Sequence, residues 1–301
     1  MPTTHTVSWS EIDCFRQCPL KHELAYKQRW SKPPVEGSPL SRGSLFHLVM
    51  ENHYSALRAR DVFGRGSNKS AEHIAMIDAL LNRGHRKPLQ TEEQALVEWM
   101  YDGYVECYGD DLDWEVVAVE YANEFWLPTE RGGRSNYKVK MKIDLVIKHR
   151  PTGLLWVVDH KSNKELPTDR MLELDDQFGL YVWGMRRLGK RVAGAIHNSC
   201  RTFQYKDPSK PYPLDSRFKR TMLYRTDEEL DTIAVEAYKT ARRAWAQTRE
   251  GDAERTPNSD TCRWRCDYTE TCLGARKDRD PAGYLNNSLT LGGFTQNRER
   301  H

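Results

Sequence analysis

The chain lacks any long apolar run. Of its 301 residues 38% are hydrophobic, yet they nowhere form the stretch of about 20 apolar residues that a transmembrane helix needs. The first residues, MPTTHTVSWSEID, have no basic segment followed by an apolar one, so they do not resemble a secretory signal. We therefore expect no membrane association and a cytoplasmic location, which for a viral protein is the host cytoplasm.

The chain also lacks the G-x-x-x-x-G-K-[ST] motif, which excludes a helicase motor of that type. The chain also has no strong overall charge, since its formal net charge is only +3. A value this small indicates neither the presence nor the absence of a nucleic-acid partner. Charge is concentrated instead in residues 186–220, where ten lysines and arginines stand against two aspartates. This basic segment is either a phosphate-binding surface or an ordinary solvated one.

Seven cysteines are present, and clustered cysteines in a cytosolic chain bind metal or act in catalysis more often than they form disulfides. Cys262, Cys266 and Cys272 form a C-x3-C-x5-C cluster, whereas Cys14 and Cys18 lie near the N-terminus. Three clustered thiolates and a distant fourth suit a zinc ion or an iron–sulfur cluster. The two ends of the chain would then be joined through metal, with the metal type and the fourth ligand both left open. The two remaining cysteines, at positions 107 and 200, are expected in the core.

Hydrophobic periodicity and capping signals predict alternating helices and strands. Helices are expected from a capping box at Ser8–Glu11, over 44–58, from Thr91, over 175–188 and over 226–248, and strands over 115–128, 137–149, 154–162 and 193–205. The segment 63–70, rich in Gly and Ser, is expected to be a flexible loop. Because three strands follow one another through short turns and the fourth follows a helix, the pattern predicts an antiparallel meander, a crossover and an α/β fold.

Two aspartates lie in the predicted meander. Asp144 is within the apolar strand MKIDLVI, and Asp159 is at the end of the next strand, VVDHKS. Antiparallel neighbours would bring both carboxylates together, which is costly unless a cation joins them. Lys161 shares a strand face with Asp159 because side chains alternate with period two. Carboxylates in this arrangement suit Mg²⁺ or Mn²⁺ and phosphoryl chemistry, whereas a D-x-K motif by itself can also be a surface ion pair.

Six motifs occur in the same order as in the PD-(D/E)XK nuclease superfamily, and the chain most resembles its RecB-like iron–sulfur exonucleases, such as the CRISPR-associated nuclease Cas-four and the AddB nuclease subunit. The motifs are Cys18-Pro19, Gly43 to His47, Asp144, Asp159-His160-Lys161, Gln177 to Tyr181, and the cluster Cys262, Cys266 and Cys272. Two departures are a C-x3-C spacing where the family often has C-x2-C, and Ile143 where a proline often precedes the aspartate. The longer spacing keeps zinc open as the metal.

The resemblance implies an α/β restriction-endonuclease-like core, in which helices flank a mixed central sheet and a four-cysteine 4Fe-4S cluster joins the chain ends. The cluster ligands would be Cys18, Cys262, Cys266 and Cys272. It further implies one nuclease domain over residues 1–280, with the two halves of the iron–sulfur module at about 8–30 and 255–275. A flexible tail would follow over 281–301.

The resemblance also implies roles for particular residues. His47, Asp144, Asp159 and the carbonyl of His160 would bind Mg²⁺ or Mn²⁺, and Asp144, Asp159 and Lys161 would be catalytic. Gln177 and Tyr181, one helical turn apart, would hold the substrate or the catalytic groups in place. Glu120 is a further carboxylate, which either approaches this site or lies at the surface.

The expected function is that of a metal-dependent DNA exonuclease acting on single-stranded DNA or DNA ends, and such an enzyme is compatible with a recombination or CRISPR-integration partner. An endonuclease would use the same chemistry. The alternative from another class is a non-catalytic nucleic-acid-binding module with a structural zinc or iron–sulfur site.

Overall fold

The computed structural model describes most of the chain. The described residues are 3–31, 39–64, 66–83, 90–203, 212–250, 253–264, 266–274 and 295–296. Contacts divide the chain into two compact units: unit 1 contains residues 1–35, 126–140 and 235–301, and unit 2 contains residues 36–125 and 141–234. The expected flexible tail, except residues 295–296, lies outside the described residues. No helix within the described ranges combines the length and the apolar character that crossing a bilayer requires.

Unit 2 is built on a mixed sheet. Its strands, in spatial order, are β3 (Trp114–Pro128), β4 (Arg134–His149), β5 (Leu155–Asn163), β6 (Val192–Arg201) and β7 (Phe218–Leu223). β5 is antiparallel to β4 and parallel to β6, and β7 is antiparallel to β6. The parallel pair needs a crossover, which contains helices α6 (Asp169–Glu173) and α7 (Asp176–Arg187). The predicted α/β fold with a mixed sheet is therefore confirmed, although β7 was not predicted.

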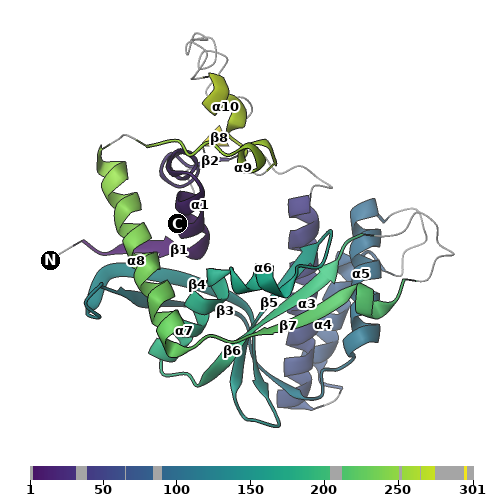
Figure 1. The fold of residues 1–301 in the computed structure, drawn as a ribbon. Helices are drawn as coiled ribbons and strands as arrows, with labels where there is room; N and C mark the ends of the chain where they lie inside the picture. The colour runs from purple at the N-terminus through teal and green to yellow at the C-terminus, as the bar shows by residue number, and fades with distance from the viewer. Residues whose placement is uncertain are drawn as a thin grey trace. The chain divides into compact units, whose positions relative to one another are not determined.

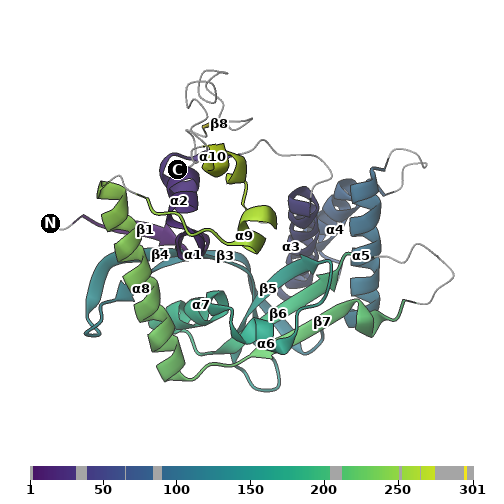
Figure 2. The same cartoon turned by 45° about the horizontal axis from the view of Figure 1, so that its top comes forward.

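Three helices of unit 2 gather together in Figures 1 and 2, apart from α7. They are α3 (Pro39–Phe63), α4 (Asn68–Leu80) and α5 (Glu92–Tyr108). Apolar side chains of α3 and α5, such as Phe46 and Met100, share one buried cluster with Leu145 of β4 and Val158 of β5. Burying a large apolar side chain contributes about 1.5–3 kcal/mol. This cluster therefore holds the helices against one face of the central strands.

The segment 63–70 is not wholly a loop, because α4 begins at Asn68. The side-chain oxygen of Ser67 accepts a hydrogen bond from the backbone N–H of Ser70 and so caps the start of the helix. The sequence does not predict α4, because glycine and serine are typical of loops as well as of helix starts. In α5 the predicted cap is confirmed, since Thr91 and Gln94 form a full capping box. Cys200 lies in the same core cluster as α5, and Cys107 packs against that cluster as a half-buried side chain.

The basic segment 186–220 does not form one exposed phosphate-binding surface within the described residues. Arg217 is only 6% exposed; its guanidinium lies over the ring of Trp99 and donates a hydrogen bond to the Trp99 carbonyl. Arg220 pairs with Asp111, and Lys219 pairs with Asp169. Long cationic side chains can pack their stems and satisfy their charge inside the fold, which composition does not reveal. Residues 204–211 of the segment lie outside the described residues.

Gly103 of α5 is predicted to be essential for packing. A Cβ atom at this position would lie closer to the guanidinium of Arg217 than real Cβ atoms come to other atoms. Gly103→Ala should therefore move the Arg217 guanidinium away from Trp99 and lower the free energy of unfolding by about 1 kcal/mol relative to Gly43→Ala, which has the same gain in helix propensity. The matched control is Gly43→Ala in α3, where the new Cβ would meet only Ser162 Oγ at an ordinary 3.7 Å. Urea unfolding of both variants checks this, and equal stabilities would contradict it.

Unit 1 contains both cysteine segments. Strand β1 (His5–Ser8) pairs in parallel with Tyr137–Lys140 of β4, and α1 (Trp9–Gln17), α2 (Pro19–His22) and a π-helix (Glu23–Lys27) follow. Ser8 caps α1 as predicted, but the Glu11 carboxylate pairs with His22. The remaining elements are β2 (Trp30–Ser31), the later part of α8 (Asp227–Glu250), α9 (Ser259–Trp264), α10 (Thr269–Gly274) and β8 (Thr295–Gln296), which pairs with β2.

Candidate functional site

The two predicted aspartates lie side by side where β4 and β5 pair in unit 2. Leu145 of β4 is opposite Val158 of β5, which places Asp144 next to Asp159 on the neighbouring strand. The Asp144 side chain is 16% exposed and the Asp159 side chain 7%. Asp144 Oδ2 accepts a hydrogen bond of 2.8 Å from the backbone N–H of His160. Two acids of a strand pair are thus almost removed from water at one point.

Each of these carboxylates is paired with a nitrogen. Lys161 Nζ lies 2.6 Å from Asp159 Oδ2, and its side chain is 36% exposed. His47 of α3 places Nδ1 3.3 Å from Asp144 Oδ2. The structure therefore brings together His47, Asp144, Asp159 and Lys161, four residues whose sequence positions span more than a hundred residues.

The surroundings drive the two carboxyl pKa values apart. Burial raises the pKa of Asp159, and the charge of Asp144 adds to the increase, although Lys161 opposes it. For Asp144 burial acts in the same direction, but the hydrogen bond from His47 and the fields of His160 and His47 outweigh it and lower its pKa. The same contact raises the pKa of His47 against the effect of burial. Neighbouring carboxyl groups with separated pKa values are typical of acid–base and metal-binding sites.

α7 brings the predicted positioning pair to the same face of the sheet. Asp175 caps the helix by accepting a hydrogen bond from the backbone N–H of Gln177. The Tyr181 hydroxyl is hydrogen-bonded to the Gln177 side chain and lies within the electrostatic reach of Asp159 and Lys161. Burial raises the pKa of this hydroxyl, so it stays a neutral hydrogen-bonding group. The Gln177 and Tyr181 side chains are thus paired with each other, with the Tyr181 hydroxyl near the acids.

The donor set at this point fits a hard divalent cation, because carboxylate oxygens are the ligands that Mg²⁺ and Mn²⁺ prefer. In the conformation seen, however, no three His, Cys, Asp or Glu side chains of the described residues are arranged to hold a metal ion. The ion pair of Asp159 with Lys161 and the contact of Asp144 with His47 occupy the oxygens that a cation would use.

Glu120 of β3 lies in the same unit and forms an ion pair with Lys142. The hydrogen bond that Lys142 donates to Glu120 is the main reason that the pKa of Lys142 is raised, and Asp144 contributes a smaller effect. Glu120 also has a φ of +51°, which is unusual for a residue other than glycine. This ion pair places the Glu120 carboxylate beside an exposed lysine two residues from Asp144.

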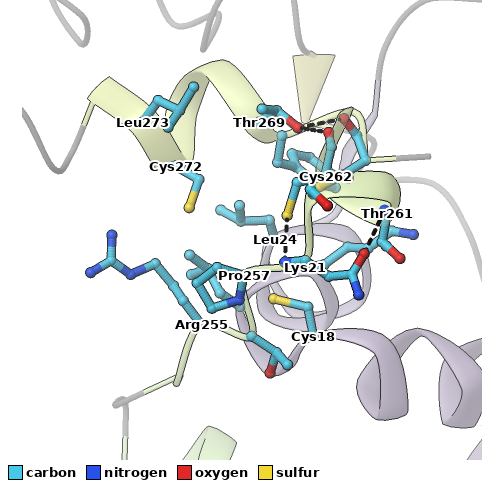
Figure 3. Close-up of a pocket in the computed structure, with 16 residues that line it drawn as sticks. Cys18, Lys21, Leu24, Arg255, Pro257, Thr261, Cys262, Thr269, Cys272 and Leu273 are labelled. Atoms are coloured by element: carbon cyan, nitrogen blue, oxygen red, sulfur yellow. Dashed lines mark hydrogen bonds between the residues drawn. The ribbon is translucent and has the colours of Figure 1, made fainter. Parts of the chain in front are cut away.

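The four cysteines named as cluster ligands line one cavity of unit 1. The cavity has a volume of about 230 Å³, and its walls are mainly apolar. Figure 3 shows the sulfur atoms of Cys18, between α1 and α2, of Cys262 in α9 and of Cys272 in α10 directed into the same space. Cys266 completes the lining set. Cys14 is buried and does not line the cavity. Four thiols therefore border one space, but in the conformation seen they are not among any group of described side chains arranged to hold a metal ion.

None of the seven cysteines, all of which lie in the described part of the chain, forms a disulfide. Tyr268 lines the same cavity and packs with Leu24, and its hydroxyl donates a hydrogen bond to the Trp30 carbonyl. These contacts tie one wall of the cavity to the N-terminal segment of unit 1.

Several residues around the site were not identified from the sequence. Behind β5 lies a buried polar network of Tyr54, Tyr104, Asp111, Asn198 and Arg220. One signal was present, because the small and apolar start of β6 is followed by the polar residues His197, Asn198 and Ser199. A polar residue buried in such a strand needs hydrogen-bond partners, and the partners come from distant parts of unit 2.

Comparison with known proteins gives one clear result. Residues 6–273 match the family model of the PD-(D/E)XK nuclease superfamily. No curated protein matches the chain. A candidate exonuclease from Eubacterium rectale has 12% sequence identity and a TM-score of 0.47, with 84% of this chain and 86% of that chain covered. LHK-Exo in complex with dAMP has 14% identity and a TM-score of 0.28, with 68% and 96% covered. Neither structural likeness is strong enough to support a function.

Proposed function

Since the chain belongs to the PD-(D/E)XK nuclease superfamily, we propose that it is a metal-dependent DNA exonuclease that hydrolyses phosphodiester bonds in single-stranded DNA or at DNA ends. The observation that carries the proposal is the meeting of Asp144, Asp159 and Lys161 at one point of the sheet. An ordinary surface Asp–Lys pair would not be expected to lie beside a second, almost buried carboxylate, because that arrangement costs free energy without a function to retain it.

In the proposed site His47, Asp144, Asp159 and the carbonyl of His160 hold Mg²⁺ or Mn²⁺. A divalent cation at such a site supplies positive charge to the phosphate and lowers the pKa of a water molecule. Lys161 orients the attacking water or stabilises the negative charge that develops on the phosphate. Its exposure allows the ammonium group to leave Asp159 and turn toward a substrate. Gln177 and Tyr181 keep the substrate phosphate and the catalytic groups aligned.

The second part of the proposal concerns unit 1, where Cys18, Cys262, Cys266 and Cys272 hold a 4Fe-4S cluster. The common cavity lined by these residues supports it. Such a cluster bonds the N-terminal helices to α9 and α10, so its role is to stabilise unit 1 and not to take part in hydrolysis. Cys18 is far from the other three cysteines in the sequence. A link through metal would therefore restrict the unfolded chain and stabilise the folded protein.

The test is anaerobic purification with iron, sulfide and zinc analysis, followed by digestion of end-labelled linear DNA with Mg²⁺ or Mn²⁺ against chelator. Release of nucleotides only with the divalent cation is the expected result, together with about four irons per chain if the cluster is of the 4Fe-4S type. Closed circular DNA should resist digestion, and its cleavage would instead indicate an endonuclease. Intact linear DNA with every cation would overturn the nuclease and favour a non-catalytic binding module.

A further inference from the structure

The side chain between the two catalytic residues of β5 points away from them. Asp159 and Lys161 share one face of the strand, so His160 projects from the opposite face, where it is buried among α3, α5 and β6. Its backbone, in contrast, belongs to the site, because the His160 N–H donates the 2.8 Å hydrogen bond to Asp144 Oδ2. Whatever holds the imidazole therefore also holds the peptide groups that carry the catalytic side chains.

Two contacts hold this imidazole. Asn198 is the partner of His160 in the register between β5 and β6, and the two side chains are joined by a 2.7 Å hydrogen bond from Asn198 Nδ2 to His160 Nδ1. On its other side the imidazole stacks on the ring of Tyr54, with centroids 5.3 Å apart and planes inclined by 17°. The hydrogen bond from Asn198 thus restricts the ring within its plane, and stacking on Tyr54 restricts its movement perpendicular to that plane.

The Tyr104 hydroxyl connects these contacts to each other. It accepts hydrogen bonds of 2.7 Å from Asn198 Nδ2 and from Arg220 Nη2, and it lies 2.6 Å from the Tyr54 hydroxyl. Four elements, α3, α5, β6 and β7, therefore meet at one oxygen atom on the side of β5 opposite the carboxylates.

The network ends on a buried ion pair. The Tyr54 hydroxyl donates a 2.7 Å hydrogen bond to Asp111, whose carboxylate also accepts two bonds, of 2.5 and 2.9 Å, from Arg220. The guanidinium is enclosed by the rings of Tyr108 and Trp114, at 3.6 and 4.0 Å from their centroids. Burying this many polar groups costs free energy that an apolar core of the same shape would avoid, so stability by itself does not account for the arrangement.

We propose that Tyr104 and Asn198 are positioning residues of the nuclease centre, which act through the buried His160 side chain to hold the Asp159–Lys161 segment and its hydrogen bond to Asp144 in the geometry that binds a divalent cation. This inference rests on the proposed function, because it concerns the same metal site. Partners that orient metal ligands without touching the metal typically contribute 10–100-fold in metal affinity or activity, which sets the scale of the expected effects.

The test compares Tyr104→Phe with Tyr101→Phe. Both tyrosines are buried on α5, and each hydroxyl has a partner, but that of Tyr101 bonds to His53 Nδ1 and not to the network. Binding of Mn²⁺ is measured by electron paramagnetic resonance without DNA, and thermal melts and DNA-cleavage kinetics are recorded alongside. Tyr104→Phe should weaken Mn²⁺ binding about tenfold and lower kcat without changing KM for DNA, whereas Tyr101→Phe should keep wild-type values for all three.

Asn198→Ala provides an independent variant, because it removes the hydrogen bond to His160 itself. It should weaken Mn²⁺ binding at least as much as Tyr104→Phe, and it keeps the test decisive if that variant folds poorly. Wild-type Mn²⁺ affinity in folded Tyr104→Phe or Asn198→Ala would overturn the positioning role. A wild-type protein that neither binds Mn²⁺ nor cleaves DNA would instead overturn the proposed function.

Discussion

Asp159→Asn is expected to lower the rate of metal-dependent DNA cleavage by about a hundredfold to a thousandfold, on the scale of removing one electrostatic stabiliser from a dehydrated site, while the protein stays folded. The amide keeps the shape of the carboxyl group but cannot supply its charge to a cation or to Lys161. Asp169→Asn is the matched control, because Asp169 also pairs with a lysine at 2.7 Å but is an exposed surface residue. The control should cleave DNA at the wild-type rate. Persistent cleavage by Asp159→Asn would remove the basis for the proposed site.

The same substitution should also change the melting temperature of the protein in a direction that depends on pH. The pKa of Asp159 is raised in the folded protein, chiefly by burial, so the stability it contributes is present at low pH and lost as the pH rises through the folded-state pKa. At pH 8 in chelator, Asp159→Asn should therefore melt at the same temperature as the wild type or higher.

Asp144→Asn should behave in the opposite way in the same melts. The pKa of Asp144 is lowered in the folded protein because the hydrogen bond from His47 and the field of His160 outweigh burial. Its ionised form stabilises the fold above the unfolded-state pKa, and this contribution is lost as the pH falls. Asp144→Asn should thus melt below the wild type at pH 8 while also losing cleavage. Equal melting shifts for the two variants would contradict the separation of the two pKa values.

If the proposed cluster is held by these cysteines, Cys266→Ala should lose the iron of unit 1 and much of the thermal stability of the protein. A link from Cys18 to the C-terminal cysteines closes a loop of more than 200 residues, and by analogy with disulfides such a link contributes on the order of 5 kcal/mol. This is a large share of the stability of a typical domain. Calorimetric melts and iron analysis of the anaerobically purified protein measure both effects.

Cys14→Ala is the matched control for this prediction. Its thiol is buried in α1, four residues before Cys18, but it does not line the cavity. We expect it to retain the metal and to lose only about 1 kcal/mol, as for a small deletion in a packed region. Full thermal stability in Cys266→Ala, or loss of iron in Cys14→Ala, would contradict the proposed ligand set.

The sequence by itself determined the features that depend on local periodicity. Period-two alternation puts Asp159 and Lys161 on one strand face, and the helical turn puts Gln177 and Tyr181 on one helix face. Short turns between β3, β4 and β5 led to the correct prediction of neighbouring strands, and with it to the pairing of the two aspartates.

Only the tertiary structure decided the features that depend on distant partners. Arg217 and Arg220 look like surface charges in the sequence. In the structure, Arg217 stacks on Trp99, and Arg220 stacks on Trp114 and pairs with Asp111. Cys14 and Cys18 are equivalent by spacing, yet the bend at Pro19 leaves Cys18 at the cavity and Cys14 in the core. The residues that form the hydrogen-bond network behind His160 come from four separate elements. No local sequence pattern predicts these contacts, because the packing of the elements determines which polar groups are buried and which of them pair.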